Sequence, residues 1–259
     1  MKTIERMVLY LGAGLGMTAV QFVENRNGYA AREQKLTKRE LPYTIGMILL
    51  DIAAPIALMM GISRTSAATV SLLNNFEIVA TSLIALLIFK EAISAKLWIG
   101  IALVTLSSGI LSVQDIQNFS WTAGSVFVLI ACVCWGFENN CTRMMSSKNP
   151  VQIVMIKGVF SGLGSLLVAL ILGETFPALF AAVCALLLGF VAYGLSIMFY
   201  IYAQRELGAA KTSAYYAIAP FIGVALSLII FRELPSAGFW VALLIMILGA
   251  YVVTVADSR

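Results

Sequence analysis

The sequence predicts an all-α, polytopic membrane protein with about nine transmembrane helices, arranged as an inverted repeat of four plus five helices. Three observations predict this fold class. Hydrophobic residues make up 61% of the 259 residues and charged residues only 12%, whereas soluble domains carry about 25% charged residues. Nine apolar stretches are each long enough to cross a bilayer. Finally, residues 62–111 reappear, without a gap, 142 positions later.

Each apolar stretch is expected to be a helix, because lipid cannot hydrogen-bond open backbone groups. About 20 helical residues cross a hydrocarbon layer of about 30 Å. The predicted spans are residues 7–23, 43–62, 66–89, 96–113, 121–141, 151–172, 178–203, 210–231 and 238–256. The segment 24–41 is the one sizeable loop, and its mixed charges indicate a solvated connector.

The second span carries a buried acid. By helical rise, Asp51 lies about 12 Å into this span. Pro55 follows one turn later on the same face and frees a backbone carbonyl there. A charge at that depth is costly. Asp51 therefore either bonds neighbouring backbone and fixes a kink, or belongs to a functional site.

Glu77 is the strongest functional candidate of the third span, where it lies about 16 Å deep. Ser71, Asn74, Glu77 and Thr81 fall close to one helical stripe, with Asn75 beside it. Burial disfavours the charged form of a carboxyl group, so Glu77 could bind and release protons or meet a cationic substrate. Asn74 and Asn75 either line a cavity or hydrogen-bond helices together.

Glu138 and Lys157 flank the short loop between the fifth and sixth spans, at similar depths. One interpretation is an ion pair that locks this hairpin. The other makes Glu138 and Asn139 cavity residues, with Lys157 biasing the carboxylate toward its charged form. Glycine pairs with the spacing of closely packed membrane helices occur in the first and sixth spans, at Gly12 and Gly16 and at Gly158 and Gly162.

The seventh and eighth spans add Tyr193, Tyr216 and Pro220 as candidates for substrate binding. Pro220 aligns with Ile78, next to Glu77, so each repeat interrupts its apolar run at the same depth. Paired interruptions at corresponding positions indicate a transport site near the midplane. The tyrosines could stack on an aromatic or cationic substrate, or they are packing and interfacial residues.

Two segments of the repeat carry a family resemblance. One runs from Thr65-Ser66-Ala67-Ala68 through Asn74-Asn75-Phe76-Glu77 to Phe89-Lys90-Glu91, and the other from Gly208-Ala209-Ala210 through Ala219-Pro220 to Phe231-Arg232-Glu233. With the duplicated bundle, they resemble the fourth and ninth helices of EamA-type members of the drug/metabolite transporter superfamily. The resemblance covers essentially the whole chain. It implies export or exchange of small metabolites or drugs by alternating access, against a proton or sodium gradient. The paired Lys90-Glu91 and Arg232-Glu233 are expected to cap or anchor helices.

Basic residues are distributed unequally between the two sides of the predicted bundle. The loops after spans one, three, five and seven, with the C-terminus, hold 12 of them, and the opposite side holds 4. This asymmetry places the first set in the cytoplasm, with the C-terminus inside and the N-terminus outside the cell (cytoplasmic or inner) membrane. The rival interpretation of residues 1–31, a cleaved signal peptide, would leave the basic loop outside.

The repeats are predicted to cover residues 1–114 and 118–259. Gly14-Leu15-Gly16 in the first span matches Gly162-Leu163-Gly164 in the sixth, so the fifth span lacks a partner in the first repeat. A preceding helix would also return the N-terminus to the cytoplasm. The expectation is therefore a ten-helix protein without its first helix, as a shortened product or as a nine-helix variant. Because that helix lines the central cavity in the family, its absence bears on activity.

The composition also excludes several classes of function. There is no histidine, and the four cysteines lie in or beside apolar stretches without a C-x-x-C pair. No P-loop, nucleophile elbow or basic stripe with interleaved aromatics occurs. We therefore expect no cofactor, enzyme activity or nucleic-acid partner. The expected partners are a small-molecule substrate and the lipid bilayer. Protons or sodium ions as coupling ions, and a second copy of the chain in a homodimer, are further possible partners. The alternative function is that of a non-transporting paralogue with a scaffold or regulatory role.

Overall fold

The computed structural model describes residues 3–27, 33–112, 122–231 and 237–256. Within these residues the regular structure is helical, and no strand occurs. The chain divides into two compact units. Unit 1 is Met1–Ile52 with Cys141–Glu206, and unit 2 is Ala53–Asn140 with Leu207–Arg259. Helices α2, α6 and α9 each contribute residues to both units.

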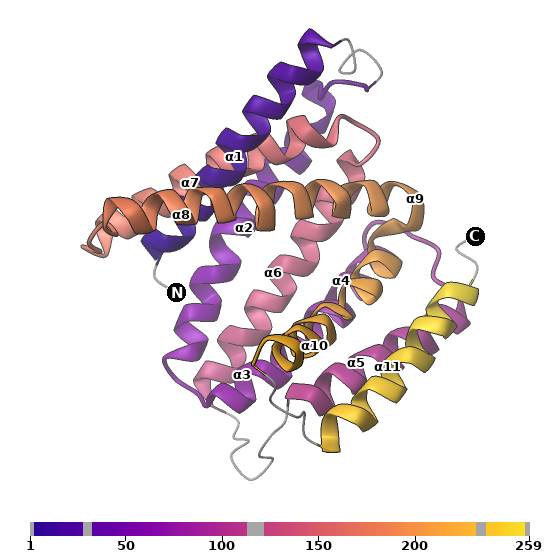
Figure 1. The fold of residues 1–259 in the computed structure, drawn as a ribbon. Coiled ribbons are helices and arrows are strands. Elements are labelled where there is room, and N and C mark those ends of the chain that lie inside the picture. The colour runs from indigo at the N-terminus through magenta and orange to yellow at the C-terminus, as the bar shows by residue number, and fades with distance from the viewer. Residues whose placement is uncertain (1–2, 28–32, 113–121, 232–236, 257–259) are drawn as a thin grey trace. The chain divides into compact units, whose positions relative to one another are not determined.

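Figure 1 traces the helices in chain order. They are α1 (Thr3–Arg26), the short 3-10 helix η2 (Lys38–Glu40), α2 (Leu41–Ile62), α3 (Ala67–Asn74), α4 (Phe76–Leu87), α5 (Ala95–Ser112), α6 (Ala123–Met145), α7 (Pro150–Ile171), α8 (Leu179–Leu188), the π-helix η4 (Gly189–Leu195), α9 (Ser196–Tyr216), α10 (Ala219–Phe231) and α11 (Ala237–Val255).

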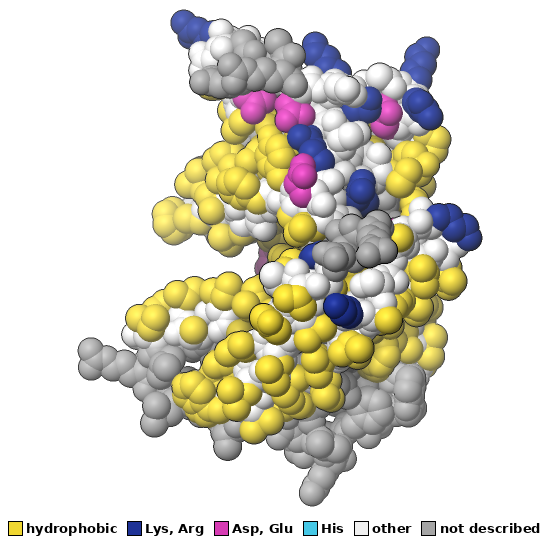
Figure 2. Space-filling view, turned by 90° about the vertical axis from the view of Figure 1, so that its right-hand side faces the viewer, with side chains coloured by type: hydrophobic (Ala, Val, Ile, Leu, Met, Phe, Trp, Pro, Cys, Tyr) yellow, Lys and Arg dark blue, Asp and Glu magenta, His cyan; other side chains and the backbone are white. Residues whose placement is uncertain are grey.

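The helices expose apolar surface as a membrane protein does. Of the described helices, 7 are long and apolar enough to cross a membrane, and Ala95–Ile110 is a shorter apolar helix. Figure 2 shows hydrophobic side chains over broad areas of the face that it draws. The prediction of an all-α, multi-pass membrane protein is confirmed. The count of nine spans and the four-plus-five repeat stay predictions.

Two predicted spans are interrupted rather than continuous. The predicted span 66–89 is divided into α3 and α4 at Asn75, and the predicted span 210–231 is divided between the end of α9 and α10. These breaks occupy equivalent positions of the repeat, because Tyr216, the last residue of α9, corresponds to Asn74, the last residue of α3. The residues of the predicted polar stripe, Ser71, Asn74, Glu77 and Thr81, thus come from two successive helical segments, and their common role stays a prediction.

Local chemistry explains both interruptions. Asn75 Nδ2 donates to the Ser71 carbonyl at 3.0 Å and so competes with the helical backbone. In the second repeat, Pro220 has no N–H with which to continue the ladder. Ile218 N donates instead to the Tyr215 carbonyl, three residues back, at 3.2 Å. A hydropathy pattern contains none of this information.

Gly208 changes the direction of α9, with φ 82° and ψ 174°. In unit 2, the Glu91 carboxylate accepts hydrogen bonds from Ala209 N at 3.0 Å and Ala210 N at 3.3 Å. Glu91 thus caps the helical segment that begins after Gly208, as a carboxylate does at a helix N-terminus. Arg232 and Glu233, the corresponding pair, lie outside the described residues.

Unit 1 is held together by close helix packing. Helix α1 packs on α7 and on α8 and η4. A Cβ atom at Gly158 would collide with the backbone of Gly14, and one at Gly12 with the backbone of Leu186. The expectation that these glycines serve close packing is confirmed.

Unit 2 has its core between α5 and α11, which run side by side (Figure 1). Leu97 and Ile101 pack there with Ala242 and Met246. Ser107 Oγ donates to the Ala242 carbonyl, which satisfies a buried hydroxyl within the apolar contact.

Candidate functional site

Each unit holds a polar cluster among its described apolar helices. The unit-1 cluster consists of Tyr10 on α1, Asp51 on α2, Lys157 on α7 and Tyr193 in η4. Tyr10 Oη donates a hydrogen bond to Asp51 Oδ1 at 2.8 Å. Lys157 Nζ lies 3.7 Å from the same oxygen. The rings of Tyr10 and Tyr193 meet edge to face, with centroids 5.3 Å apart.

Burial makes the charges of this cluster expensive. Asp51 is 2% exposed and Lys157 6% exposed. Removing both charges from water costs several kcal/mol per ion, which mutual attraction offsets only in part. The separation of 3.7 Å is an ionic contact rather than a direct hydrogen bond. Such a pair adds little to stability, which favours a functional reason for keeping it.

The π-helix brings Tyr193 to this cluster. A π-helical turn is wider than an α-helical turn and is often found at functional sites. Gly189 begins η4, and a Cβ atom there would collide with the backbone of Leu9. The absence of a side chain at Gly189 therefore lets α1 approach η4, which places Tyr10 against Tyr193.

The unit-2 cluster joins α4 to α6 and consists of Glu77, Thr81, Asn139 and Asn140. Asn139 Nδ2 donates to Glu77 Oε1 at 3.2 Å and to Thr81 Oγ1 at 3.3 Å. Asn140 Nδ2 donates to the Thr81 carbonyl at 3.0 Å and to the Gly136 carbonyl at 2.8 Å. The two asparagines thus bond α6 to the first turns of α4.

The helix break gives Glu77 a distinct electrostatic position. Glu77 lies in the first turn of α4 and is half-buried. The positive end of the helix dipole at that turn favours its negative charge. Nearby, Asn74 Oδ1 at the end of α3 is buried and accepts no hydrogen bond from the described residues. A polar solute could donate hydrogen bonds to this acceptor and to the Glu77 carboxylate.

The structure supports some groupings of the predicted residues and changes others. Asp51, Lys157 and Tyr193 come together in unit 1, and Glu77 and Asn139 in unit 2. The sequence suggested Glu138 as a partner of Lys157. In the structure, Lys157 lies beside Asp51. Glu138 and Lys157 belong to different units, and their pairing stays a prediction.

The other candidates lie at the helix breaks or in α6. Asn75 bonds the Ser71 carbonyl at the first break. Tyr216 ends α9 with 59% exposure, and Pro220, also exposed, is the second residue of α10. Glu138 is buried in α6 next to Asn139. Their roles in binding stay predictions.

Sequence reasoning missed Tyr10. A tyrosine ring within an apolar span does not stand out from the hydrophobic residues around it. The available signal was its hydroxyl group, which needs a hydrogen-bond partner when it is buried in a membrane-spanning helix. Asp51 was already identified as a buried polar group, but the contact between α1 and α2 could not be derived from spacing.

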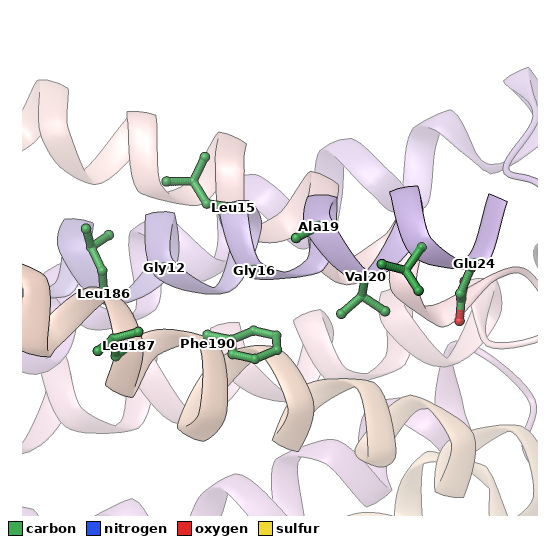
Figure 3. Close-up of a pocket in the computed structure, with 10 residues that line it drawn as sticks. Gly12, Leu15, Gly16, Ala19, Val20, Glu24, Leu186, Leu187 and Phe190 are labelled. Atoms are coloured by element: carbon green, nitrogen blue, oxygen red, sulfur yellow. The ribbon is translucent and has the colours of Figure 1, made fainter. Parts of the chain in front are cut away.

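A separate cleft in unit 1 is apolar. It has a volume of about 540 Å³ and lies between α1 and α8 (Figure 3). Leu15, Val20 and Phe190 line it together with glycines, and Glu24 is the one charged residue on its wall. With so few polar groups, the cleft cannot fix the orientation of a polar solute. We therefore place the candidate site at the polar clusters.

Metal-binding groups do not gather in the described part of the chain. No set of three or more Cys, Asp or Glu residues there could hold a metal ion. All four cysteines have free thiols. The chemistry that these clusters offer is proton exchange, ion pairing and hydrogen bonding to a solute.

The family model that matches this chain and the two relatives named below are all described as transporters. The EamA-like transporter family matches residues 7–113 and 122–255. A Methanothermobacter thermautotrophicus protein, named an uncharacterized transporter, is 28% identical over 214 residues, which cover 79% of this chain. The Bacillus subtilis protein named uncharacterized transporter YyaM is 21% identical over 209 residues, or 76% of this chain.

The relatives are longer than the matched segment. That segment spans 62% of the archaeal protein and 67% of the bacterial protein. One solved crystal structure of a protein superposes with a TM-score of 0.80, over 97% of this chain and 86% of the other, at 14% identity. At that identity, the likeness concerns the fold alone.

Proposed function

Since the chain belongs to the EamA-like transporter family, as its resemblance predicted, we propose that it is a secondary transporter. It moves a small metabolite or drug-like molecule across the cytoplasmic membrane by alternating access. The observation that carries this proposal is a polar cluster in each unit that contains at least one ionisable group. Each charge in a membrane-spanning helix costs about 2.5–3.5 kcal/mol on insertion scales, so such groups are retained where transport needs them.

The two helix breaks support the same function. Transporters with inverted repeats place their sites at discontinuous helices, where freed backbone groups and helix ends meet the solute. Here α3 ends at Asn74 and α9 ends at Tyr216, which are equivalent residues of the two repeats. Glu77 follows the first break and Pro220 follows the second. The proposal therefore assigns these breaks to the path along which the solute moves.

Glu77 is proposed as the proton-coupling carboxyl group. Its Oε1 accepts from Asn139 Nδ2, and this amide also contacts Thr81 Oγ1. A proton on Glu77 would convert an acceptor into a donor and so change which groups this network can offer to a solute. Binding of a proton and binding of the solute are thereby linked through the same amide.

The experiment is transport in vesicles reconstituted with the full chain, under an imposed pH gradient. A panel of metabolites and cationic drugs is tested as substrate. We expect at least one compound to accumulate with the gradient, and Glu77→Gln to abolish that accumulation while the protein still inserts. Glu24→Gln, near the end of α1 and outside both clusters, is the matched control. Full accumulation by Glu77→Gln would remove Glu77 from the mechanism.

A further inference from the structure

The unit-1 cluster contains a charge arrangement that coupling at Glu77 does not use. Asp51 and Lys157 hold opposite charges 3.7 Å apart, 2% and 6% exposed. The groups that face Asp51 come from several elements. Tyr10 approaches from α1 and Lys157 from α7, and the ring of Tyr193 lies behind Tyr10 in η4. On α6, the Cys141 thiol lies next to α2 at Gly46, about one and a half turns before Asp51.

Protonation of Asp51 would change the charge of this cluster by one unit. The Asp51 carboxylate would become a neutral acid, and one negative charge would be lost beside Lys157. Whatever else the lysine contacts, the surroundings of its ammonium group become more positive. In a poorly solvated interior, charges interact more strongly than in water. Binding of an anion near Lys157 is therefore more favourable after Asp51 has been protonated.

We propose that the unit-1 cluster binds the carboxylate group of a small anionic substrate together with one proton. The proton adds to an Asp51 carboxylate oxygen, and the Lys157 ammonium group then pairs with the substrate carboxylate. No other bond is formed or broken, and the net charge of the cluster is the same before and after. This inference rests on the transporter function proposed above and names its substrate class.

Tyr10 is the positioning residue of this exchange. Its hydroxyl donates to Asp51 Oδ1 and so stabilises the charged carboxylate. Its ring is held by the edge-to-face contact with Tyr193. When Asp51 is protonated, the same hydroxyl can accept a hydrogen bond instead. Tyr10 thus sets how acidic the medium must be before the anion can bind.

The charge arrangement favours an anion over a cation. A cationic substrate would place a second positive charge beside the Lys157 ammonium group, at a site where solvent screening is weak. The unit-1 cluster therefore differs in expected selectivity from the unit-2 cluster, where Glu77 is the charged group.

The test uses the purified full chain in detergent, in a weakly buffered solution with a pH indicator. The probes are acetate, benzoate and succinate, with acetamide, benzamide and benzylamine as matched neutral and cationic compounds. Binding is followed by calorimetry, and proton uptake by the indicator. We expect at least one carboxylate to bind more tightly at acidic than at alkaline pH, with uptake of about one proton per anion.

Three variants separate the roles. Asp51→Asn mimics the protonated acid, so we expect it, in a Glu77→Gln background, to bind the carboxylate without pH dependence and without proton uptake. Lys157→Met should weaken carboxylate binding by about tenfold or more, because it removes the charged partner. Tyr10→Phe keeps the ring and removes the donor, so the pH below which the anion binds should rise. Tyr215→Phe, which loses a hydrogen bond to Thr254 in unit 2, is the control.

The proposal is overturned if no carboxylate binds more tightly than its amide or if benzylamine binds in preference. It is also overturned if Asp51→Asn, combined with Glu77→Gln to remove the other proposed proton-binding group, still takes up a proton on binding. The preference of the unmodified protein for a carboxylate over the matched amide and amine tests the anion site even if a variant does not fold. Vesicle transport distinguishes the two proposals. Gradient-driven movement of an amine or a neutral compound alone would keep the transporter function and reject the anion site. No movement of any compound would reject the transporter function itself.

Discussion

Gly158 shows how a missing side chain sets the distance between two membrane helices. A Cβ atom at Gly158 would collide with the backbone of Gly14, which cannot withdraw as a flexible side chain can. Close approach of this kind allows dispersion contacts between α1 and α7. By contrast, a Cβ atom at Gly223 in α10 would meet nothing within 4 Å. Gly158 and Gly223 therefore make a matched pair for substitution by alanine.

We expect Gly158→Ala to destabilise the protein by about 1–3 kcal/mol, because an added methyl group would overpack the contact between α1 and α7. Gly223→Ala should be neutral or slightly stabilising, since alanine favours a helix and finds open space there. Thermal unfolding in one detergent, followed by intrinsic fluorescence, measures both. Equal midpoints for the two variants would contradict the packing argument.

The candidate site could be predicted residue by residue but not as a set of contacts. Asp51, Glu77 and Lys157 were identified because each places a charge in an apolar span, and that cost is visible in the sequence. The contact of Lys157 with Asp51 depends on how α2 and α7 meet in space, which the sequence does not show. Tyr10 was missed because its ring matches an apolar pattern.

At the scale of elements, two loop carboxylates cap helices that are remote in sequence. Glu91 accepts from Ala209 N and Ala210 N, and Glu174 accepts from Thr3 N and Ile4 N. Each acid follows a residue with positive φ, which is Lys90 at 57° and Gly173 at 65°. A left-handed residue reverses the chain after a helix and can aim the next side chain at another helix. Both units therefore contain a residue with positive φ that is followed by a capping carboxylate.

We expect Glu91→Gln to weaken the start of the helical segment after Gly208, because a neutral amide loses the charge that the helix N-terminus favours. The expected loss is about 1 kcal/mol, within the usual range for a cap. Hydrogen exchange should speed up at the amides of Ala209 and Ala210. Glu206→Gln, on the exposed side of α9, is the control. Unchanged exchange at both amides would show that the Glu91 charge does not hold this break.

The extent of most helices was predictable, but their continuity was not. The predicted spans 96–113 and 151–172 agree closely with α5 and α7, because the transition from apolar to polar residues marks where a helix leaves lipid. The break at Asn75 depends on a hydrogen bond to the Ser71 carbonyl within an otherwise apolar run. A hydropathy average over many residues does not register a single hydrogen bond of this kind.

At the scale of the whole molecule, orientation follows from charge rather than from packing. The predicted cytoplasmic side holds 12 basic residues and the opposite side 4. Positively charged loops are retained in the cytoplasm during insertion. Ser63, after α2, and Ser147, between α6 and α7, are both exposed and lie on opposite predicted sides. They offer a direct test of the topology.

We expect Ser63→Cys to react with a membrane-impermeant maleimide in intact cells, and Ser147→Cys to react only after the cells are opened. Both are made after the four native cysteines are replaced by alanine. The physical reason is that the basic side stays in the cytoplasm, so Ser147 is shielded by the membrane while Ser63 faces the medium. Labelling of the opened cells shows that both variants are present and reactive. The reverse pattern would invert the topology, and labelling of both positions from outside would show that the charge asymmetry does not determine a single orientation.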